Sequence, residues 1–111
     1  MNYVIPNLSP PLMPDFKSIP EMAFDSMKDE IASFQRGLSD EDEVGVVANG
    51  AGLIIHVRYV RLSGQMFVFD GVDGDQREAR LIQHYTQVNV QMIAVKKLED
   101  APQRIGFEFG K

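Results

Sequence analysis

Residues 44–75 read VGVVANGAGLIIHVRYVRLSGQMFVFDGVDGD, and this stretch decides the fold. Short runs rich in β-branched and aromatic residues alternate here with glycine-containing turns, a pattern typical of antiparallel hairpins. The expected strands, in this stretch and beyond it, are residues 44–48, 53–62, 66–69, 79–85, 92–98 and 105–109. Because short connections join antiparallel neighbours, we expect a five- or six-stranded antiparallel sheet that is curled or barrel-like.

One amphipathic helix is expected before the strands, over residues 19–36. Ser18 followed by Glu21 matches a capping box, and Pro20 is tolerated in the first turn of a helix. Gly37 supplies a stop. Apolar residues recur at steps of three and four along one face, so we expect this face to be buried against the sheet through Phe24, Met27, Ile31 and Phe34.

The N-terminal residues 1–17 are interpreted as an extended arm. Five of the six prolines lie within the first twenty residues, which disfavours helix and central strand and favours extended chain. The arm is too rich in apolar residues for a solvated linker, so we expect it to lie against its own domain or against a neighbouring subunit. The chain is thus divided into the arm, 1–17, and a single α+β domain, 18–111.

The composition fits one small domain and excludes several classes of protein. With 111 residues and 44% hydrophobic content, the chain can bury one core. The absence of cysteine excludes disulfides and thiolate chemistry, which fits a reducing compartment. Neither a signal-peptide pattern nor an apolar run of about 20 residues occurs, so we expect a cytoplasmic protein with no membrane partner.

The net charge of −5 is concentrated in residues 1–43, which carry nine acidic and three basic residues. An acidic protein gains little from the release of counterions from phosphates, so long DNA or RNA is not expected as a partner. A local basic pocket is still compatible with one small anion.

The residue types used in catalysis are present but are not combined in a complete motif. No serine has a Gly-x-Ser-x-Gly setting, and no phosphate-binding glycine loop or zinc-binding histidine pair occurs. His84-Tyr85-Thr86 resembles half of the paired His-x-Thr motif of two-histidine phosphodiesterases, but His56 lacks the matching hydroxyl residue. The acidic turn 70–75 does not follow the ligand spacing of a calcium loop. We therefore expect no enzymatic activity, no metal and no cofactor.

Residues 83–91 read QHYTQVNVQ and place polar side chains between two hydrophobic strands. Amides, a hydroxyl, an imidazole and a phenol offer neutral hydrogen-bonding groups and a stacking face, which suit a small polar ligand better than acid–base turnover. The alternative is structural, with these side chains capping the next strand and satisfying backbone groups at a bend. The candidate ligand-binding residues are Gln83, His84, Tyr85, Gln87, Asn89 and Arg104.

Arginine would supply the positive charge for an anionic ligand, since a guanidinium binds phosphate or carboxylate through paired hydrogen bonds. If the second strand is regular, Arg58 shares a face with His56 and Val60, and Arg61 lies on the opposite face. These two arginines are therefore not expected in one pocket. Further candidates are Arg77, Arg80 and Arg104, although an arginine is more commonly a partner in a surface salt bridge.

Two resemblances accompany these patterns. A helix followed by five short, bent strands is similar to the outline of Sm-like RNA-binding barrels, but the segments by which those proteins contact RNA have no counterpart here. Residues 81–84 (LIQH), 87–89 (QVN) and 104–107 (RIGF) resemble a family of short bacterial and phage proteins known only as a domain of unknown function. This second resemblance implies no activity. It implies a bacterial or phage source and a polar run that forms one local feature with Arg104.

Two functions of different classes remain open from the sequence. The first hypothesis is a non-enzymatic, homo-oligomeric binding module that holds a small anionic or nucleotide-like ligand between the polar run and nearby arginines. In a phage, such a module would sequester a host signalling nucleotide. The alternative is a structural or protein-interaction factor without a small-molecule ligand, whose partner binds the helix, the acidic turn at residues 39–43 or the arm.

Overall fold

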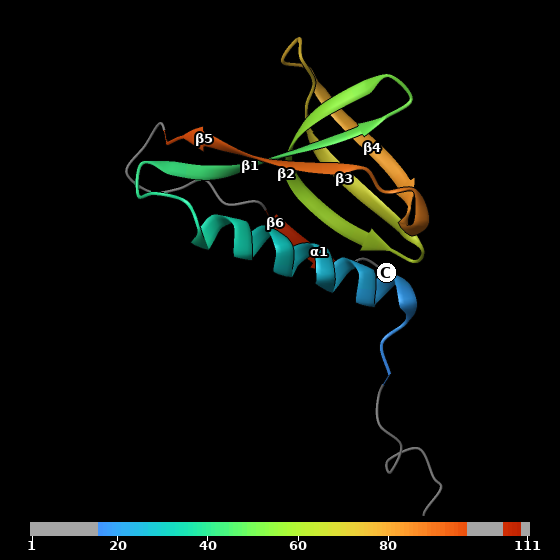
Figure 1. The fold of residues 1–111 in the computed structure, drawn as a ribbon. Helices are drawn as coiled ribbons and strands as arrows, with labels where there is room; N and C mark the ends of the chain where they lie inside the picture. The colour runs from blue at the N-terminus through green and yellow to red at the C-terminus, as the bar shows by residue number, and fades with distance from the viewer. Residues whose placement is uncertain (1–15, 98–105, 110–111) are drawn as a thin grey trace, which may run out of the picture.

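A computed structural model describes residues 16–97 and a further strand at 106–109. Figure 1 shows the elements, which follow in the order α1 (Ile19–Arg36), β1 (Asp42–Gly50), β2 (Leu53–Ser63), β3 (Met66–Val72), β4 (Glu78–His84), the 3₁₀ turn η3 (Tyr85–Gln87), β5 (Val90–Lys96) and β6 (Gly106–Phe109). Of the expected arm, only Phe16 and Lys17 fall within the described residues. The α+β fold class expected from the sequence is confirmed.

Helix α1 begins and ends at the expected residues. Ser18 Oγ accepts a hydrogen bond from the Glu21 N–H, and the Glu21 carboxylate accepts one from the Ser18 N–H at 2.8 Å. Pro20 occupies the first turn, and the Gly37 N–H donates back to the Phe34 carbonyl at the other end. The capping pattern in the sequence thus satisfies both ends of the helix. Within the described ranges, no helix combines the length and the apolar character needed to cross a bilayer.

Five antiparallel strands form a curled sheet in the order β4-β3-β2-β1-β5. Strands β1 to β4 make a meander, whereas β5 crosses back and pairs with β1 along its whole length, from Val90 opposite Ala48 to Lys96 opposite Asp42. Among the described residues no backbone pairing joins β4 to β5, so the sheet is not closed into a barrel. Strand β6 differs from the expected antiparallel arrangement, because it runs parallel to β2.

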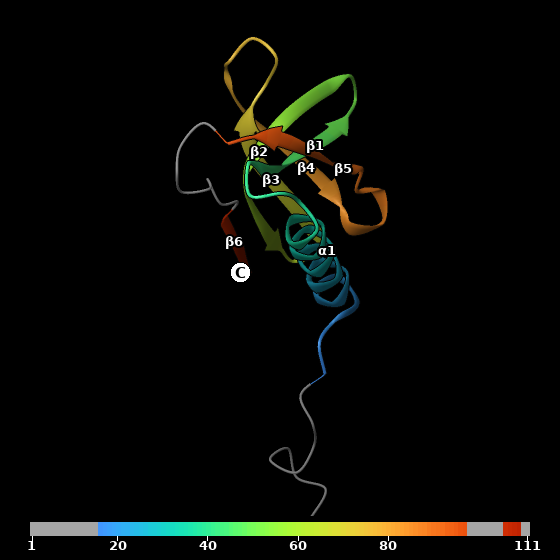
Figure 2. The same ribbon diagram turned by 60° about the vertical axis from the view of Figure 1, so that its left-hand side comes forward.

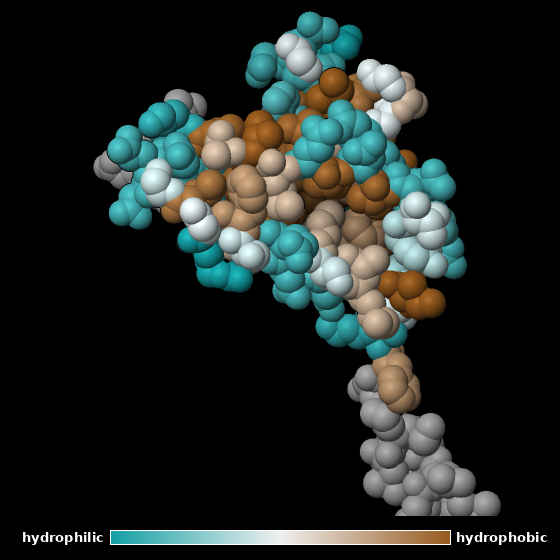
Figure 3. Space-filling model, viewed as in Figure 1, coloured by the Kyte–Doolittle hydropathy of each residue, from teal (hydrophilic) through white to brown (hydrophobic). Residues whose placement is uncertain are grey.

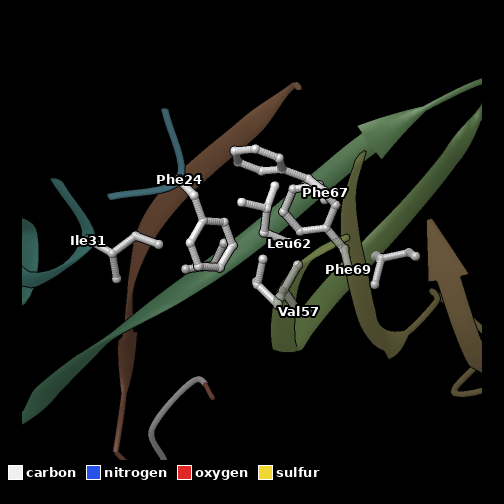
Figure 4. Close-up of a cluster of buried hydrophobic side chains, with 10 residues drawn as sticks. Phe24, Ile31, Val57, Leu62, Phe67 and Phe69 are labelled. Carbon is white, nitrogen blue, oxygen red and sulfur yellow. The ribbon is translucent and has the colours of Figure 1, made fainter. Parts of the chain in front are cut away.

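The hydrophobic core is formed by residues of α1 and of the strands on the inner side of the sheet. Helix α1 packs against β1, β2 and η3 (Figure 2). The Phe24 ring meets the Phe67 ring edge to face, with 5.3 Å between the ring centroids (Figure 4). Of the helix residues expected in the core, Phe24 and Ile31 are buried, but Met27 and Phe34 are only partly buried. The apolar stripe of the helix is therefore wider than the strip that touches the sheet.

An extra residue in β2 changes which of its side chains share a face. Val57 of β2 lies opposite Gly71 of β3, and Tyr59 lies opposite the next residue along β3, Asp70. Arg58, between them, has no residue opposite it, which is the pattern of a β-bulge. The expectation that Arg58 and Arg61 lie on opposite faces is therefore wrong, and both lie on the face away from the core. The burial pattern records the shift, since the buried residues of β2 are Ile55, Val57, Val60 and Leu62.

Gly71 is required where the bulge brings β2 and β3 together. A Cβ atom at this position would lie only 1.9 Å from the backbone oxygen of His56, far inside van der Waals contact. Every residue except glycine carries a Cβ atom, so the two backbones can approach this closely only with glycine at position 71.

Candidate functional site

The side-chain amide of Gln83 links three segments across the gap where the sheet is not closed. Its Nε2 donates to the Asn49 backbone oxygen at 2.7 Å, and its Oε1 accepts from the Asn89 N–H at 3.2 Å. The Asn49 N–H donates in turn to the Asn89 backbone oxygen at 3.0 Å. A Cβ atom at Gly50 would lie 2.6 Å from that Nε2, so glycine makes room for the amide. Gln83 thus joins β4 to the end of β1 and to the residue before β5.

His84 is held by contacts at both ring nitrogens. Its Nε2 lies 2.8 Å from Gln65 Oε1 in the turn between β2 and β3, and its Nδ1 lies 2.8 Å from Thr86 Oγ1. The Thr86 N–H also donates to Nδ1, at 3.3 Å, which assigns the proton of the neutral ring to Nε2 and makes Gln65 its acceptor. His84 therefore caps η3 from the end of β4.

The remaining candidate residues have separate environments. Tyr85 packs against the core, and its ring lies 4.7 Å from the His84 ring, centroid to centroid. Gln87 and the Asn89 side chain are exposed. Arg104 lies outside the described residues. The structural alternative for the polar run, in which its side chains cap a turn and satisfy backbone groups, accounts for the contacts of Gln83 and His84. A ligand site at the six candidate residues stays a prediction.

Three of the candidate arginines meet carboxylates within the chain. Arg58 lies 2.6 Å from Glu78, Arg80 2.5 Å from Asp70, and Arg77 2.8 Å from Asp73. The hydrogen bond and the charge of Asp70 raise the pKa of Arg80 above its usual value. A guanidinium that already contacts a carboxylate gains less from a new anion, since the anion must compete with that carboxylate.

Two of these ion pairs border a shallow depression on the outer face of β3 and β4, lined by Asp70, Glu78, Ala79 and Arg80. Two acidic side chains and one basic side chain line it, so it is not a basic pocket suited to an anion. The sequence did not reveal this grouping because it depends on the β3–β4 register, which places Asp70 opposite Arg80.

Asp73 is buried and organises the turn between β3 and β4. Its Oδ1 accepts from the N–H groups of Asp75 and Arg77, both at 2.9 Å, and its Oδ2 accepts from Arg77 Nε at 2.8 Å. These hydrogen bonds, above all the one from the Arg77 backbone, lower the pKa of Asp73. In the part of the chain that the structure describes, no group of His, Asp and Glu side chains is placed to hold a metal ion.

Exposed apolar side chains are the feature that the sequence analysis missed. Phe16, Ile19 and Met22, which we call the helix tip, are 82%, 65% and 56% exposed. Figure 3 shows hydrophobic side chains at this end of the helix. On the sheet, Ile54, Ile82 and Ile93 are also exposed. The sequence did hold a signal for the helix tip, because its three residues are spaced three apart. They lie beside the apolar stripe of α1 that packs against the sheet, and so they do not belong to it.

Comparison with protein-family models, with curated proteins and with solved structures gives no match for this chain. The resemblance to short bacterial and phage proteins therefore stays a prediction. Within residues 16–97, no buried side-chain nitrogen or oxygen lacks a hydrogen-bond partner, so no unsatisfied polar group marks a ligand site there. Function must be inferred from the contacts and exposed surfaces described above.

Proposed function

We propose that this chain is a non-enzymatic protein-interaction module whose partner binds the helix tip. The observation that carries the proposal is the exposure of three large apolar residues at one end of α1, while Gln83 and His84 are engaged within the chain. A ligand that takes over an existing hydrogen bond gains little, because one bond replaces another. Neighbouring exposed apolar residues, by contrast, are typical of protein-binding surfaces.

The charge around the helix tip indicates the chemistry of the partner. Glu21 and Asp25 flank the tip on α1, and the nearby Lys17 is paired with Asp25. Residues 1–43 as a whole carry nine acidic and three basic residues. A matching surface would have an apolar groove with a basic rim, because complementary charge favours encounter and correct orientation.

The contacts of His84 support a function without catalysis. A general acid or base must reach the reacting group through a ring nitrogen, and both nitrogens of His84 already meet Gln65 or Thr86. The other histidine, His56, is exposed on β2. Neither ring is paired with an activated nucleophile in the described residues.

Affinity capture from cells that naturally make the chain tests the proposal. Wild type is compared with the double variant Ile19→Lys/Met22→Lys and with the matched control Ser33→Lys, which adds charge at an exposed position of the same helix. A protein retained by wild type and by the control, but lost with the double variant, is then purified and titrated directly. We expect its affinity for the double variant to fall at least tenfold.

A thermal-shift panel of nucleotides and metabolites separates this function from the small-ligand hypothesis. A ligand at a hundred times its dissociation constant adds about 2.7 kcal/mol to the free energy of unfolding. A saturable shift that is lost in Gln83→Ala or His84→Ala, together with no partner that depends on the helix tip, would overturn the proposal in favour of a ligand-binding module.

A further inference from the structure

In residues 16–97 and 106–109, no strand pairs with the outer edge of β5, and the strand itself lacks the usual protection of an edge. In soluble proteins such edges are guarded by charges, prolines, bulges or a covering segment, because free backbone groups pair readily with another strand. Strand β5 has no proline, and its one charged residue is Lys96 at the end, where Glu41 lies 3.4 Å away. From Val90 to Val95 the strand carries no charge, and among the described residues it pairs only with β1.

The register shows which backbone groups of β5 are free. At the two ends of the ladder, the Asn49 N–H donates to the Asn89 oxygen and the Lys97 N–H donates to the Glu41 oxygen, each at 3.0 Å. Hydrogen-bonded positions alternate in an antiparallel ladder, so odd-numbered residues of β5 bond to β1. The N–H and C=O groups that point away from β1, and that pair with no other described strand, therefore belong to Val90, Met92, Ala94 and Lys96.

The opposite end of the sheet is better protected. By the same reasoning, the bond from the Tyr85 N–H to the Gln65 oxygen shows that odd-numbered residues of β4 bond to β3. The backbone groups of the even-numbered residues point away from β3, and no other described strand pairs with them. Three of these residues carry charged or polar side chains that are fixed by neighbours on β2, β3 or the connecting turn: Glu78, Arg80 and His84. The two end strands thus differ, and the unguarded one is β5.

We propose that the β5 edge binds a second copy of this chain, so that two β5 strands run antiparallel about a two-fold axis at Ile93. In this register Met92 lies opposite Ala94 of the other copy, and Val90 lies opposite Lys96. All four residues with free backbone groups then gain hydrogen-bonded partners. Two-fold pairing is the commonest form of protein self-association, and it joins the two sheets into one.

The side chains of β5 are compatible with this register. Ile93 is 42% exposed, and its neighbour on β1 is Gly45, which has no side chain to cover it. The two Ile93 residues would face each other at a non-hydrogen-bonded position, where side chains of opposite strands are closest. Lys96 lies opposite an apolar residue, so the register brings no like charges together.

A single cysteine tests the register, because the chain has none of its own. Residues opposite each other at a non-hydrogen-bonded position have Cα atoms about 4.5 Å apart, within the range that a disulfide bridges. We expect Ile93→Cys to form a disulfide-linked dimer under mild oxidation, reversed by reductant. The matched control Ile82→Cys, on the β4 edge, should stay monomeric on a non-reducing gel.

Proline substitution tests the edge itself. Ala94→Pro removes an edge N–H that bonds to no strand in the monomer, and edge strands tolerate proline at such positions. Sedimentation equilibrium of the wild type should give twice the 12.5 kDa of one chain, and Ala94→Pro should raise the dissociation constant at least tenfold. The matched control Ile82→Pro, at the free edge of β4, should retain the wild-type constant.

Three results would overturn the inference. The first is a wild type that stays monomeric at its highest soluble concentration. The second is an assembly larger than two chains that Ile82→Pro dissociates, which would indicate pairing between β4 and β5. The third is the absence of a disulfide in Ile93→Cys, which would contradict the proposed register. This result does not depend on whether Ala94→Pro folds. None of these results bears on the partner of the helix tip.

Discussion

The side chain of Gln83 bridges the gap between β4 and β5. Gln83 contributes both a donor and an acceptor there, to the Asn49 carbonyl and to the Asn89 N–H. Gln83→Ala would leave both backbone groups without their side-chain partner, so we expect the free energy of unfolding to fall by about 1–3 kcal/mol. Urea denaturation followed by circular dichroism measures the change.

Gln87→Ala is the matched control for this experiment, because Gln87 is an exposed amide in the same polar run. Its free energy of unfolding should stay within about 0.5 kcal/mol of wild type. Equal losses in the two variants would contradict the bridging role of Gln83.

The hydrogen bonds of Asp73 should make the free energy of unfolding depend on pH in the acid range. Its hydrogen bonds to Arg77 and Asp75 hold its pKa in the folded protein below the usual 3.8. The unfolded chain therefore binds the proton first as the pH falls. The stabilisation is complete above the usual pKa and is lost as the pH drops through the folded-state pKa.

Asp73→Asn removes this titration, so its stability should fall less steeply than that of wild type between about pH 5 and pH 2. Asp29→Asn, on the exposed side of α1, is the control and should follow the wild-type profile. Unfolding free energies measured at each pH give the comparison. Parallel curves for wild type and Asp73→Asn would contradict the assignment.

The sequence located the polar run but not the contacts made within it. A pattern of amides and an imidazole is compatible both with binding a ligand and with satisfying backbone groups. The contacts of Gln83 depend on where Asn49 and Asn89 are brought by the curl of the sheet, which is a property of the tertiary fold. The ion pair of Arg80 with Asp70 likewise follows from a register that the sequence does not specify.

At the level of elements, the contact of α1 with the sheet is concentrated at Phe24. Its side chain is fully buried and packs edge to face on Phe67. Phe24→Ala should lower the free energy of unfolding by about 3–5 kcal/mol, the range for removing a buried aromatic side chain. Met22→Ala, on the exposed side of the same helix, should change it by less than about 0.5 kcal/mol. Thermal and urea unfolding of both variants test the difference.

The close approach of β2 and β3 beside the bulge leads to a separate prediction for Gly71. Gly71→Ala would force its new methyl group against the His56 carbonyl, so we expect β2 and β3 to separate locally and stability to fall by about 1–3 kcal/mol. Gly74→Ala is the matched control, since nothing lies within 4 Å of a Cβ atom there. A wild-type melting curve for Gly71→Ala would show that the strands can relax without cost.

Local elements were predictable where their signals are local. The capping box placed α1, and the glycine turns placed β1 to β4 within a few residues of their observed ends. The bulge at Arg58 was not predictable, because hydrophobic residues on both sides of it also fit a regular strand. The parallel pairing of β6 with β2 involves distant residues, and hairpin signals carry no information about it.

For the whole molecule, the order of the strands matters most. Strand β1 has a neighbour on each side only because β5 returns to it, and Val44 pairs with Ala94 far along the chain. On the side of β1 that faces away from β5, the pairing with β2 begins at Val47. Before that point, helix α1 supplies a hydrogen-bond partner, since the Val44 N–H donates to Gln35 Oε1 at 2.8 Å. The fold thus adds two long-range pairings, β6 with β2 and β5 with β1, to a local meander. The pairing of β5 with β1 brings Val90 and Met92 against the core.

This long-range pairing implies an order of events during synthesis on the ribosome. The hairpins among β1, β2, β3 and β4 can form as soon as they leave the exit tunnel, whereas β1 has no second neighbour until Val90–Lys96 has emerged. Ribosome-bound chains that expose residues up to Asn89 should protect amides of β3 from hydrogen exchange and leave unprotected the amides of β1 that face β5, such as those of Gly45 and Val47. Protection of these amides should then appear in one step, as the nascent chain lengthens past Lys96.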